Sequence, residues 1–499
     1  MYAKVYSATL VGLQGRLIEV EADVLNGLSS FSIVGLPDQS INESKERIAL
    51  AIRSIKAKPP LKFNKKTIVN LAPADLKKEG PILDLAVAVS FLIASGQLIK
   101  PKKKILFLAE LGLNGRLRKV KGALPIILSL TKENFDEIHL PQENYEEVKY
   151  LKNQPIFLFN NLQDLIAHLE NRQIEEPLQA EEFKPEPDET DFSFLKIPEH
   201  ILRALIIAAG GKHNLLLHGP PGTGKTLIAQ NIVSLLPGLT YAEAIEVSSV
   251  QSAIGQFDQF KTRPPFRNPH HSASAIAILG GGQTPKPGEI SLAHHGVLFF
   301  DELPEFHRDV LEGLREPLET NEITVSRSKQ TLKFPARFIF IGAYNPCPCG
   351  FYDDPEKECV CSAAEIRRYR KKISGPLLDR MDIFLNIPRQ KSAEIFKENK
   401  INVARTKTLI NDLRLKQEER QGKANAELKP KELKEFCLLE PASQTLLETA
   451  ADRLRLSLRG IHKILKISRT IADLDQTETI APAAVAEATQ YRFQNDGQT

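Results

Sequence analysis

A glycine-rich segment, "NLLLHGPPGTGKT" at residues 214–226, constrains the fold of this chain more than any other feature. It runs from an apolar strand through a tight turn into the start of a helix, and it contains the full pattern G-x-x-x-x-G-K-T. Glycines let the backbone N–H groups point at phosphates, while the lysine adds positive charge and the threonine hydroxyl binds Mg²⁺. The sequence therefore predicts an α/β nucleotide-binding domain whose phosphate site comprises Gly219, Pro220, Pro221, Gly222, Thr223, Gly224, Lys225 and Thr226.

Two further apolar strands end in polar residues that suit the same site. "GVLFFDE" ends in an acidic pair, from which we expect Asp301 to hold Mg²⁺ through water and Glu302 to orient or deprotonate the attacking water. "RFIFIGAYN" ends at Asn345, whose amide is a candidate sensor of the γ-phosphate; the alternative is a turn residue at a strand end. Together these patterns predict a Mg²⁺-dependent NTPase, with ATP and Mg²⁺ as cofactors.

Composition limits the compartment and the partners. The chain has 499 residues, five cysteines and a formal net charge of +4. So few cysteines exclude a disulfide framework, which predicts reduced thiols and a cytoplasmic location. No run approaches the roughly 18 apolar residues of a membrane span, so we expect no membrane partner. A net charge this small does not by itself indicate a polyanionic partner.

The clearest break in the chain is an acidic stretch with prolines, "NRQIEEPLQAEEFKPEPDETDF", which lacks a hydrophobic period. We interpret it as a solvated linker, residues 171–194, behind an N-terminal domain, residues 1–170. The nucleotide-binding core then spans residues 195–388, with a four-cysteine insertion at 347–361. In residues 389–499 apolar positions recur at three- and four-residue steps, which predicts an amphipathic helical lid.

Several segments resemble one protein family. "GPPGTGKT", "GVLFFDELPEF", "YNPCPCG", "SGPLLDRMDI" and "LRGIHKILKISRTIADL" resemble the bacterial Mg-chelatase-like AAA+ proteins of the ComM/YifB family, and the resemblance covers nearly the whole chain. The family is implicated in natural transformation, as a hexameric, ATP-driven motor for branch migration of recombination intermediates. The resemblance thus implies a DNA helicase that assembles as a homo-hexamer and acts on branched, single-stranded or double-stranded DNA.

Two arginines acquire roles from this resemblance. Arg380, in "PLLDRMD", matches an arginine finger that reaches the γ-phosphate bound by the neighbouring subunit, where a planar guanidinium spreads transition-state charge. Arg459, in "SLRGIHKIL", matches the sensor-2 arginine of the helical lid, and relatives differ on whether it acts in cis or in trans. The alternative for Arg459 is one charge among several on an exposed helix.

The segment "NEITVSRSKQTLKFPARF" alternates apolar and polar residues on both sides of a polar tip, which predicts a β-hairpin. Chelatase-like and MCM-like AAA+ proteins insert such a hairpin before sensor 1, and in the helicase relatives it lines the central pore. We expect Arg327 and Lys329 at the tip to contact DNA phosphates; the alternative is an exposed turn with two cations. The further candidates for DNA contact are Arg263, Arg267, Arg367, Arg368 and Arg370.

The N-terminal domain resembles the Lon-type proteolytic domain in "LAPADLKKEGPILDLAVAVSFL" and "AELGLNGRLRKVKGALPI". In this chain Ile82 stands near the position of the nucleophilic serine, and Pro125 stands near that of the activating lysine. Without the Ser/Lys dyad there is no acyl chemistry to run. We therefore expect an α/β, Lon-protease-like fold that serves binding or assembly.

Four of the five cysteines lie in "NPCPCGFYDDPEKECVC", residues 345–361. Four thiols in one short loop of a reducing compartment fit a tetrahedral zinc site better than disulfides. The expected ligands of Zn²⁺ are Cys347, Cys349, Cys359 and Cys361, in a structural rather than a catalytic site. Thiols without metal and a redox switch are the alternatives.

Three function classes remain open from the sequence. The first is the DNA-translocating ring ATPase. The second is a motor subunit of a metal chelatase, which shares the ATPase core and works on a porphyrin partner. The third is a nucleotide-dependent scaffold whose Lon-like domain binds protein, and a scaffold would keep its function when ATP is bound but not cleaved.

Overall fold

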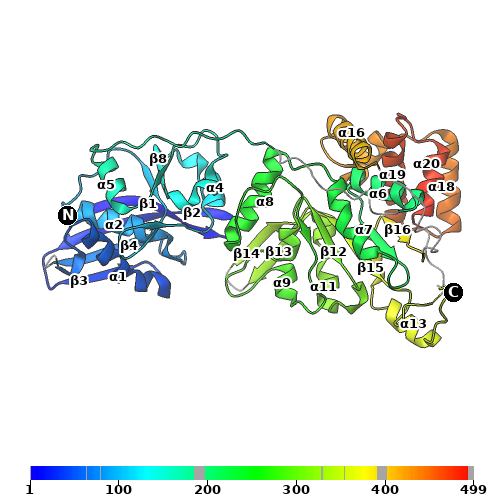
Figure 1. Cartoon of the computed structure of the whole chain (residues 1–499), viewed down its shortest axis with the longest axis horizontal. Helices are drawn as coiled ribbons and strands as arrows, with labels where there is room; N and C mark the ends of the chain where they lie inside the picture. Colours follow the sequence, from blue (N-terminus) through cyan, green and yellow to red (C-terminus); the bar gives the residue numbers. More distant parts are fainter. Residues whose placement is uncertain are drawn as a thin grey trace. The chain divides into compact units, whose positions relative to one another are not determined.

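The structure is a computed structural model, and the residues it describes are 2–62, 65–78, 80–184, 197–327, 330–352, 354–389 and 402–492. The chain divides into two compact units, and each unit is described by itself. The first unit comprises Met1–Lys184 and Tyr241–Lys261, and the second comprises Pro185–Thr240 and Thr262–Thr499. Both units combine helices and strands, which confirms the predicted α/β class (Figure 1).

The first unit is built on a seven-stranded sheet with the order β3-β4-β2-β1-β5-β8-β9. Its long hairpin pairs β1 with β2 in antiparallel register, and β1 in turn pairs with β5 in parallel. The strands are β1 (Tyr2–Val11), β2 (Gln14–Leu25), β3 (Ser30–Val34), β4 (Lys66–Ala72), β5 (Ile105–Phe107), β8 (Glu137–Pro141) and β9 (Ile156–Phe159), beside a small pair, β6 (Glu110–Leu111) and β7 (Leu117–Arg118).

Helices complete the core of the first unit. The apolar segment "PILDLAVAVSFLIAS" contains α2 (Asp84–Ala94), and every residue of this helix is buried. Ile82 and Pro125 are also buried, so apolar side chains fill both positions at which the Lon resemblance would place the dyad. The other helices are α1 (Gln39–Ser54), α3 (Ala123–Ser129), α4 (Tyr145–Val148), α5 (Leu162–Leu169) and α8 (Tyr241–Ile254).

The predicted acidic linker is described only in part. Residues 171–184 form no helix or strand, but their backbone is bound to the first unit. The N–H of Leu178 donates to the carbonyl of Ile156 at 2.7 Å, and the N–H of Glu181 donates to that of Lys149 at 2.8 Å. Residues 185–194 lie outside the described residues.

The second unit contains a five-stranded sheet with the order β11-β12-β15-β10-β16. All neighbouring strands in it are parallel. Their carboxyl ends therefore lie along one edge, where open α/β sheets bind ligands. The strands are β10 (Leu215–His218), β11 (Phe266–Arg267), β12 (Val297–Phe300), β15 (Ile339–Tyr344) and β16 (Ile383–Asn386).

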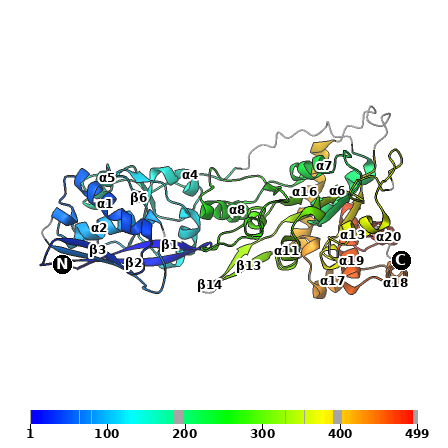
Figure 2. The ribbon, with the colours of Figure 1, turned by 90° about the horizontal axis from the view of Figure 1, so that it is seen from below.

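The predicted pre-sensor-1 hairpin is present between β12 and β15. It consists of β13 (Glu322–Arg327) and β14 (Gln330–Pro335), which pair antiparallel from Glu322–Pro335 to Arg327–Gln330. Figure 2 shows it as a two-stranded ribbon that extends from the rest of the second unit. The helices beside the sheet and the hairpin are α6 (Glu199–Gly211), α7 (Lys225–Ile232), α9 (Ala275–Leu279), α10 (Glu289–Leu292), α11 (Arg308–Gly313), α12 (Pro317–Thr320), α13 (Ala363–Arg370) and α14 (Gly375–Leu378).

The predicted helical C-terminal region is confirmed for residues 402–492, which Figure 1 shows in orange to red beside β16. It shares a hydrophobic core with the sheet, because Ile464 and Ile467 belong to the same buried cluster as Leu215 and Ile383. Its helices are α16 (Val403–Gln421), α17 (Pro430–Phe436), α18 (Pro441–Arg453), α19 (Leu458–Leu474) and α20 (Pro482–Gln490). Across the described parts of both units, no helix has the length and apolar character needed to cross a membrane.

Candidate nucleotide and metal sites

The predicted phosphate-binding loop (residues 219–226) leads from β10 into α7 at the carboxyl edge of the parallel sheet. Gly222 and Gly224 have φ angles of 78° and 87°, a region that glycine adopts without strain. A side chain at Gly219 would place its Cβ 2.2 Å from the carbonyl oxygen of Ile387, so only glycine fits there. The glycines of the motif are thus required by the backbone path and by the close approach of the segment after β16.

Lys225 lies inside this loop. Its Nζ donates to the carbonyls of Gly219 and Pro220 at 2.6 and 2.8 Å and to Oδ1 of Asn345 at 3.1 Å. Burial lowers the pKa of Lys225 to about 8, and the charge of Asp301 opposes this shift. The acceptors that Lys225 contacts among the described residues are neutral, so an anionic phosphate beside it would stabilise the buried ammonium.

Thr226 and Asp301 come together from α7 and the end of β12. The Thr226 hydroxyl donates to Oδ2 of Asp301 at 2.7 Å. Hydroxyl and carboxylate oxygens are hard ligands of the kind Mg²⁺ takes, together with water and phosphate oxygens. The pair therefore fits a Mg²⁺ ion at the mouth of the phosphate-binding loop.

Glu302 follows Asp301 in a left-handed backbone conformation, with φ at 50°. Its side chain is 57% exposed, and Oε2 lies 3.5 Å from Nδ1 of His271. The rings of His270 and His271 lie with their centroids 4.2 Å apart and their planes tilted by 33°. His271 follows β11, so the pairing of β11 with β12 brings it to Glu302; nothing in the local sequence pattern marked it for this place.

The structure brings Arg380 and Arg459 together at one acid. Nη2 of Arg380 lies 2.8 Å from Oε1 of Glu319, and Nη2 of Arg459 lies 3.0 Å from the same oxygen. Arg380 also donates from Nε to the carbonyl of Arg315 at 3.1 Å. Glu319, in α12, is one acid of several in "LREPLETNE", and no sequence pattern distinguishes it from the others.

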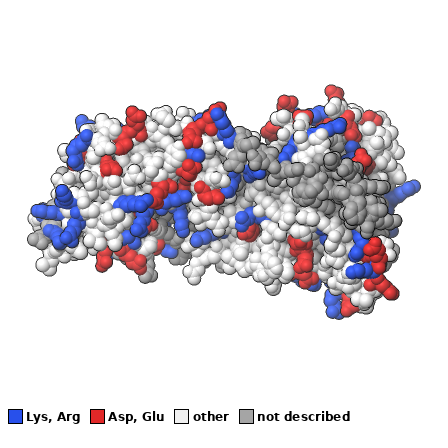
Figure 3. Space-filling model, in the orientation of Figure 1, with Lys and Arg blue, Asp and Glu red and all other residues white. Residues whose placement is uncertain are grey.

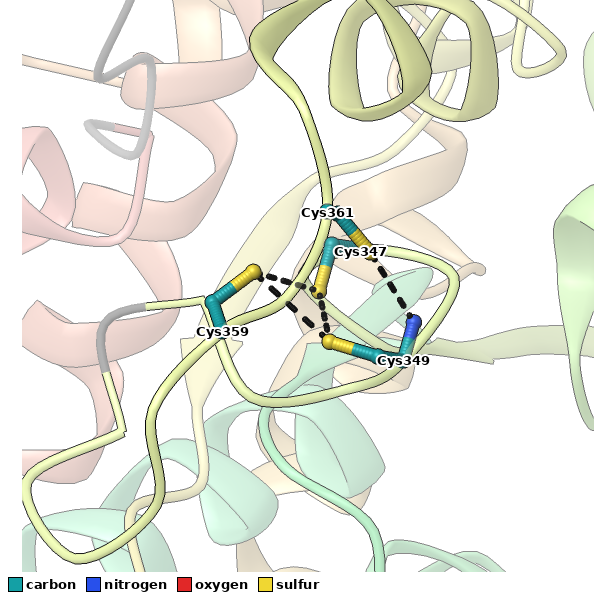
Figure 4. A group of neighbouring side chains, drawn as sticks. All are labelled: Cys347, Cys349, Cys359 and Cys361. Atoms are coloured by element: carbon teal, nitrogen blue, oxygen red, sulfur yellow. Dashed lines mark hydrogen bonds between the residues drawn. The ribbon is translucent and has the colours of Figure 1, made fainter.

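The four cysteines of the 345–361 segment converge in space, and Figure 4 shows their Sγ atoms turned toward a common centre. The Sγ of Cys347 lies 3.3 Å from that of Cys349, and the Sγ of Cys359 lies 3.6 Å from both. The Sγ of Cys361 accepts the N–H of Cys349 at 3.4 Å, and all four Sγ atoms lie within 4.8 Å of one another. Zinc at about 2.3 Å from four tetrahedral thiolates sets S–S distances of about 3.8 Å, against about 2 Å for a disulfide. The four side chains fit one zinc ion.

The candidates for DNA contact differ in their surroundings. Arg367 and Arg368 are exposed on α13, and Arg263 is exposed before β11. Arg267 instead binds Glu289, with 2.5 Å from Nε to Oε2, and the guanidinium of Arg370 lies 5.1 Å from the ring centroid of Tyr352. These last two arginines are half-buried and contact other side chains of the second unit.

The two candidates on the hairpin are described only in part, and the surface charge of the described residues is mixed. Arg327 ends β13, the structure describes its backbone only, and Lys329 lies outside the described residues. On the face in Figure 3, Lys and Arg are interspersed with Asp and Glu over the described residues of both units. Charge on that face therefore does not mark a single basic surface.

Three family models match separate segments of the chain. The family model "Magnesium chelatase, subunit ChlI" matches residues 191–395, "Subunit ChlI of Mg-chelatase" matches 20–144, and "Magnesium chelatase, subunit ChlI C-terminal" matches 402–492. "Competence protein ComM" of Haemophilus influenzae is 42% identical over 98% of this chain and 97% of its own length. "Uncharacterized protein YifB" of Escherichia coli is 39% identical over 98% and 96%. "Magnesium-chelatase 38 kDa subunit" of Cereibacter sphaeroides is 23% identical over 31% of this chain and 52% of its own length.

Proposed function

The chain belongs to the Mg-chelatase-like AAA+ family that includes ComM and YifB, and from this premise we propose that it is an ATP-driven, ring-forming DNA motor. Its proposed substrates are recombination intermediates, on which it drives branch migration during natural transformation in the cytoplasm. The observation that carries the ATPase part is the meeting of Lys225, Thr226, Asp301 and Asn345 at one sheet edge. The similarity to a competence protein over nearly the full length of both chains supports the DNA part.

The proposed hydrolysis follows from the site. Lys225 exchanges its contacts with Gly219 and Pro220 for the β- and γ-phosphates of ATP, whose charge compensates the buried ammonium. Thr226 and Asp301 would hold Mg²⁺, which supplies charge neutralisation at the phosphates when bound. Glu302, which His271 keeps at the mouth of the site, orients and deprotonates the attacking water.

The completed site needs a second subunit. In the described part of the chain, the contacts of Arg380 and Arg459 lie with Glu319 and neighbouring backbone and not with the phosphate-binding loop. A finger that cannot serve its own nucleotide serves that of a neighbour, as in rings in which an arginine is supplied in trans. Because Arg459 shares the carboxylate of Arg380, we infer that it acts in trans as well, and we propose a homo-hexamer.

DNA contact is assigned to the tip of the β13–β14 hairpin, through Arg327 and Lys329, and to the exposed Arg367 and Arg368 on α13. Contacts of this kind read phosphate charge and not base sequence. The first unit, with Ile82 and Pro125 in place of the dyad, is proposed to be a Lon-like domain for binding or assembly. The cysteine cluster is proposed to hold a structural Zn²⁺.

The chelatase alternative has less support. The 38 kDa chelatase subunit matches only 31% of this chain, whereas the competence protein matches 98%. The family models named for the chelatase subunit ChlI match residues 20–144, 191–395 and 402–492, so the preference for a DNA motor rests on the full-length similarity to the competence protein. The scaffold alternative is separated from a motor by Glu302→Gln, since a scaffold works with ATP bound and uncleaved.

The ATPase rate of the purified full-length chain tests the proposal. It is measured with MgATP alone, with single-stranded DNA, with duplex DNA and with a four-way junction, alongside electron microscopy of the same samples for rings. We expect DNA to raise the rate several-fold and rings to form with ATP and DNA. A rate and an assembly state indifferent to all three DNA substrates would refute the motor.

A further inference from the structure

The segment between β15 and α13, which we call the cysteine loop (residues 346–361), is long and has little core of its own. Its described residues form no helix or strand, and the buried ones are Pro346, Cys347 and Gly350. Val360 is 84% exposed. Irregular loops of this length are uncommon in compact domains, and segments without a sufficient core are held by disulfides or metals. The converging cysteines are therefore the place at which a bound metal ion would fix the loop.

The fixed turn of this loop lies directly against the phosphate-binding loop. The N–H of Gly350 donates to the carbonyl of Cys347 at 3.0 Å, which closes the turn that carries the first two cysteines. A Cβ on Gly350 would lie 2.7 Å from Cδ and 3.1 Å from Cγ of Pro221. The same Cβ would lie 3.9 Å from Cγ of Asn345. Only a residue without a side chain lets the turn pack this closely on Pro221.

A second contact ties the cysteine loop to the other end of the phosphate-binding loop. Asp354 pairs with Arg389, with 3.1 Å between Oδ2 and Nη2. Arg389 follows Ile387, whose N–H donates to the carbonyl of His218 at 2.7 Å and whose own carbonyl abuts Gly219. The cysteine loop thus backs the phosphate-binding loop at Pro221 and, through Arg389 and Ile387, near Gly219.

From these contacts we propose that Zn²⁺ bound by Cys347, Cys349, Cys359 and Cys361 braces the phosphate-binding loop, so that ATP affinity depends on the zinc. Fixing a loop in its bound conformation lowers the entropic cost of binding, and binding a structural metal contributes to local folding. This inference rests on the ATP site of the proposed function and not on its DNA activity.

Metal removal from the full-length protein tests this directly. Zinc content is measured by mass spectrometry, and the dissociation constant of a fluorescent ATP analogue is measured without DNA, before and after zinc is displaced by a mercurial and after it is restored. We expect about one zinc per chain and, on its removal, a loss of ATP affinity of about tenfold that Zn²⁺ reverses. Protein purified without zinc that binds ATP normally, or a depleted and folded chain with unchanged affinity, would overturn the proposal.

Two pairs of variants distinguish zinc-dependent support of the phosphate-binding loop from a general loss of folding. Cys359→Ser removes a ligand, and Cys437→Ala changes the cysteine buried in the helical region outside the cluster. Gly350→Ala adds the Cβ that clashes with Pro221, while Gly422→Ala introduces one at a φ of 69° with no atom within 4 Å. We expect Cys359→Ser to lose zinc and ATP affinity together, Gly350→Ala to keep zinc but bind ATP about tenfold more weakly, and both controls to bind normally.

The outcomes for these variants test separately whether zinc supports the phosphate-binding loop and whether the chain is a DNA motor. Normal ATP binding by Gly350→Ala contradicts the brace even if Cys359→Ser does not fold. Zinc-dependent ATP affinity in a chain whose ATPase ignores DNA supports the brace and refutes the DNA motor. A zinc-loaded chain that binds no ATP refutes both.

Discussion

The guanidinium of Arg380 forms an ion pair with Glu319, with 2.8 Å between Nη2 and Oε1. The same oxygen lies 3.0 Å from Nη2 of Arg459, so one carboxylate holds two cations that would otherwise repel each other. In the ring that we propose, Glu319 keeps both arginines on the face that meets the neighbouring subunit.

Replacing Arg380 by Ala is expected to leave ATP binding intact and to lower the hydrolysis rate by about 10³-fold, because the finger contributes charge stabilisation only in the transition state. Mixing this variant with Lys225→Ala should restore part of the rate, since some interfaces then combine an intact phosphate-binding loop with an intact finger. Arg453→Ala, an exposed arginine on α18, is the control. A mixture as inactive as its two components would contradict action in trans.

His271 is predicted to position Glu302. Replacing His271 by Ala should lower kcat about tenfold without changing ATP affinity, because the histidine contacts the base and not the nucleotide. His270→Ala removes the neighbouring ring and serves as the control. Equal effects of the two variants, or a weakened ATP affinity in His271→Ala alone, would argue against a positioning role.

Acid is predicted to destabilise the second unit through two buried groups. Asp382 binds Lys463, accepts the N–H of Asn214 at 2.8 Å and lies 3.9 Å from Nδ1 of His213. Burial opposes ionisation of Asp382, but the charges of Lys463 and His213 and the hydrogen bonds outweigh it and lower its pKa to about 2. Burial lowers the pKa of His213 to about 4.

Both pKa values lie below their unfolded values, so the unfolded chain takes up protons first as pH falls. The free energy of unfolding should therefore fall by about 1.4 kcal/mol per pH unit between about pH 6.5 and 4 through His213, and further below about pH 4 through Asp382. Urea unfolding followed by circular dichroism at several pH values measures this. His213→Gln should flatten the upper part of the profile, and His307→Gln, at an exposed histidine, should not. A profile identical in all three proteins would exclude His213 as the cause.

The β13–β14 hairpin is predicted to carry phosphate contacts. Replacing Arg327 and Lys329 by Ala should weaken DNA binding equally for all sequences and reduce the slope of log affinity against log salt by about 1 per lost contact. The ATPase rate without DNA should stay unchanged. Lys333→Ala is the control on the same hairpin, because Lys333 pairs with Glu322 at 2.9 Å. An unchanged slope of log affinity against log salt in the double variant would contradict phosphate contact by Arg327 and Lys329.

The residues of the candidate phosphate site could be predicted from the sequence, because each lies close to the end of an apolar strand. Lys225, Asp301 and Asn345 each follow an apolar run closely, and parallel strands bring their carboxyl ends to one edge. The contact of His271 with Glu302 could not be predicted in this way, because it depends on the pairing of β11 with β12. The role of Glu319 could not be predicted either, since its partners Arg380 and Arg459 come from two other segments of the chain.

The sequence does not show which of the candidate arginines already contact other side chains of the same chain. Arg267 and Arg370 were candidates for DNA by charge alone, but Glu289 and Tyr352 engage them inside the second unit. A run of cations in a sequence does not reveal which acids or rings lie opposite it. Gly350 shows the same limit, because the sequence does not reveal its φ of 86° or the approach of Pro221 from a distant loop.

Branch migration of a synthetic mobile four-way junction by the full-length chain tests whether this protein is an ATP-driven DNA motor. Labelled strands report exchange with MgATP, without nucleotide and with the Glu302→Gln variant. We expect complete strand exchange by the unmodified chain with MgATP, and none by Glu302→Gln, although that variant should bind ATP and DNA. Exchange that proceeds equally in the variant, or no exchange by a chain that hydrolyses ATP, would contradict this expectation.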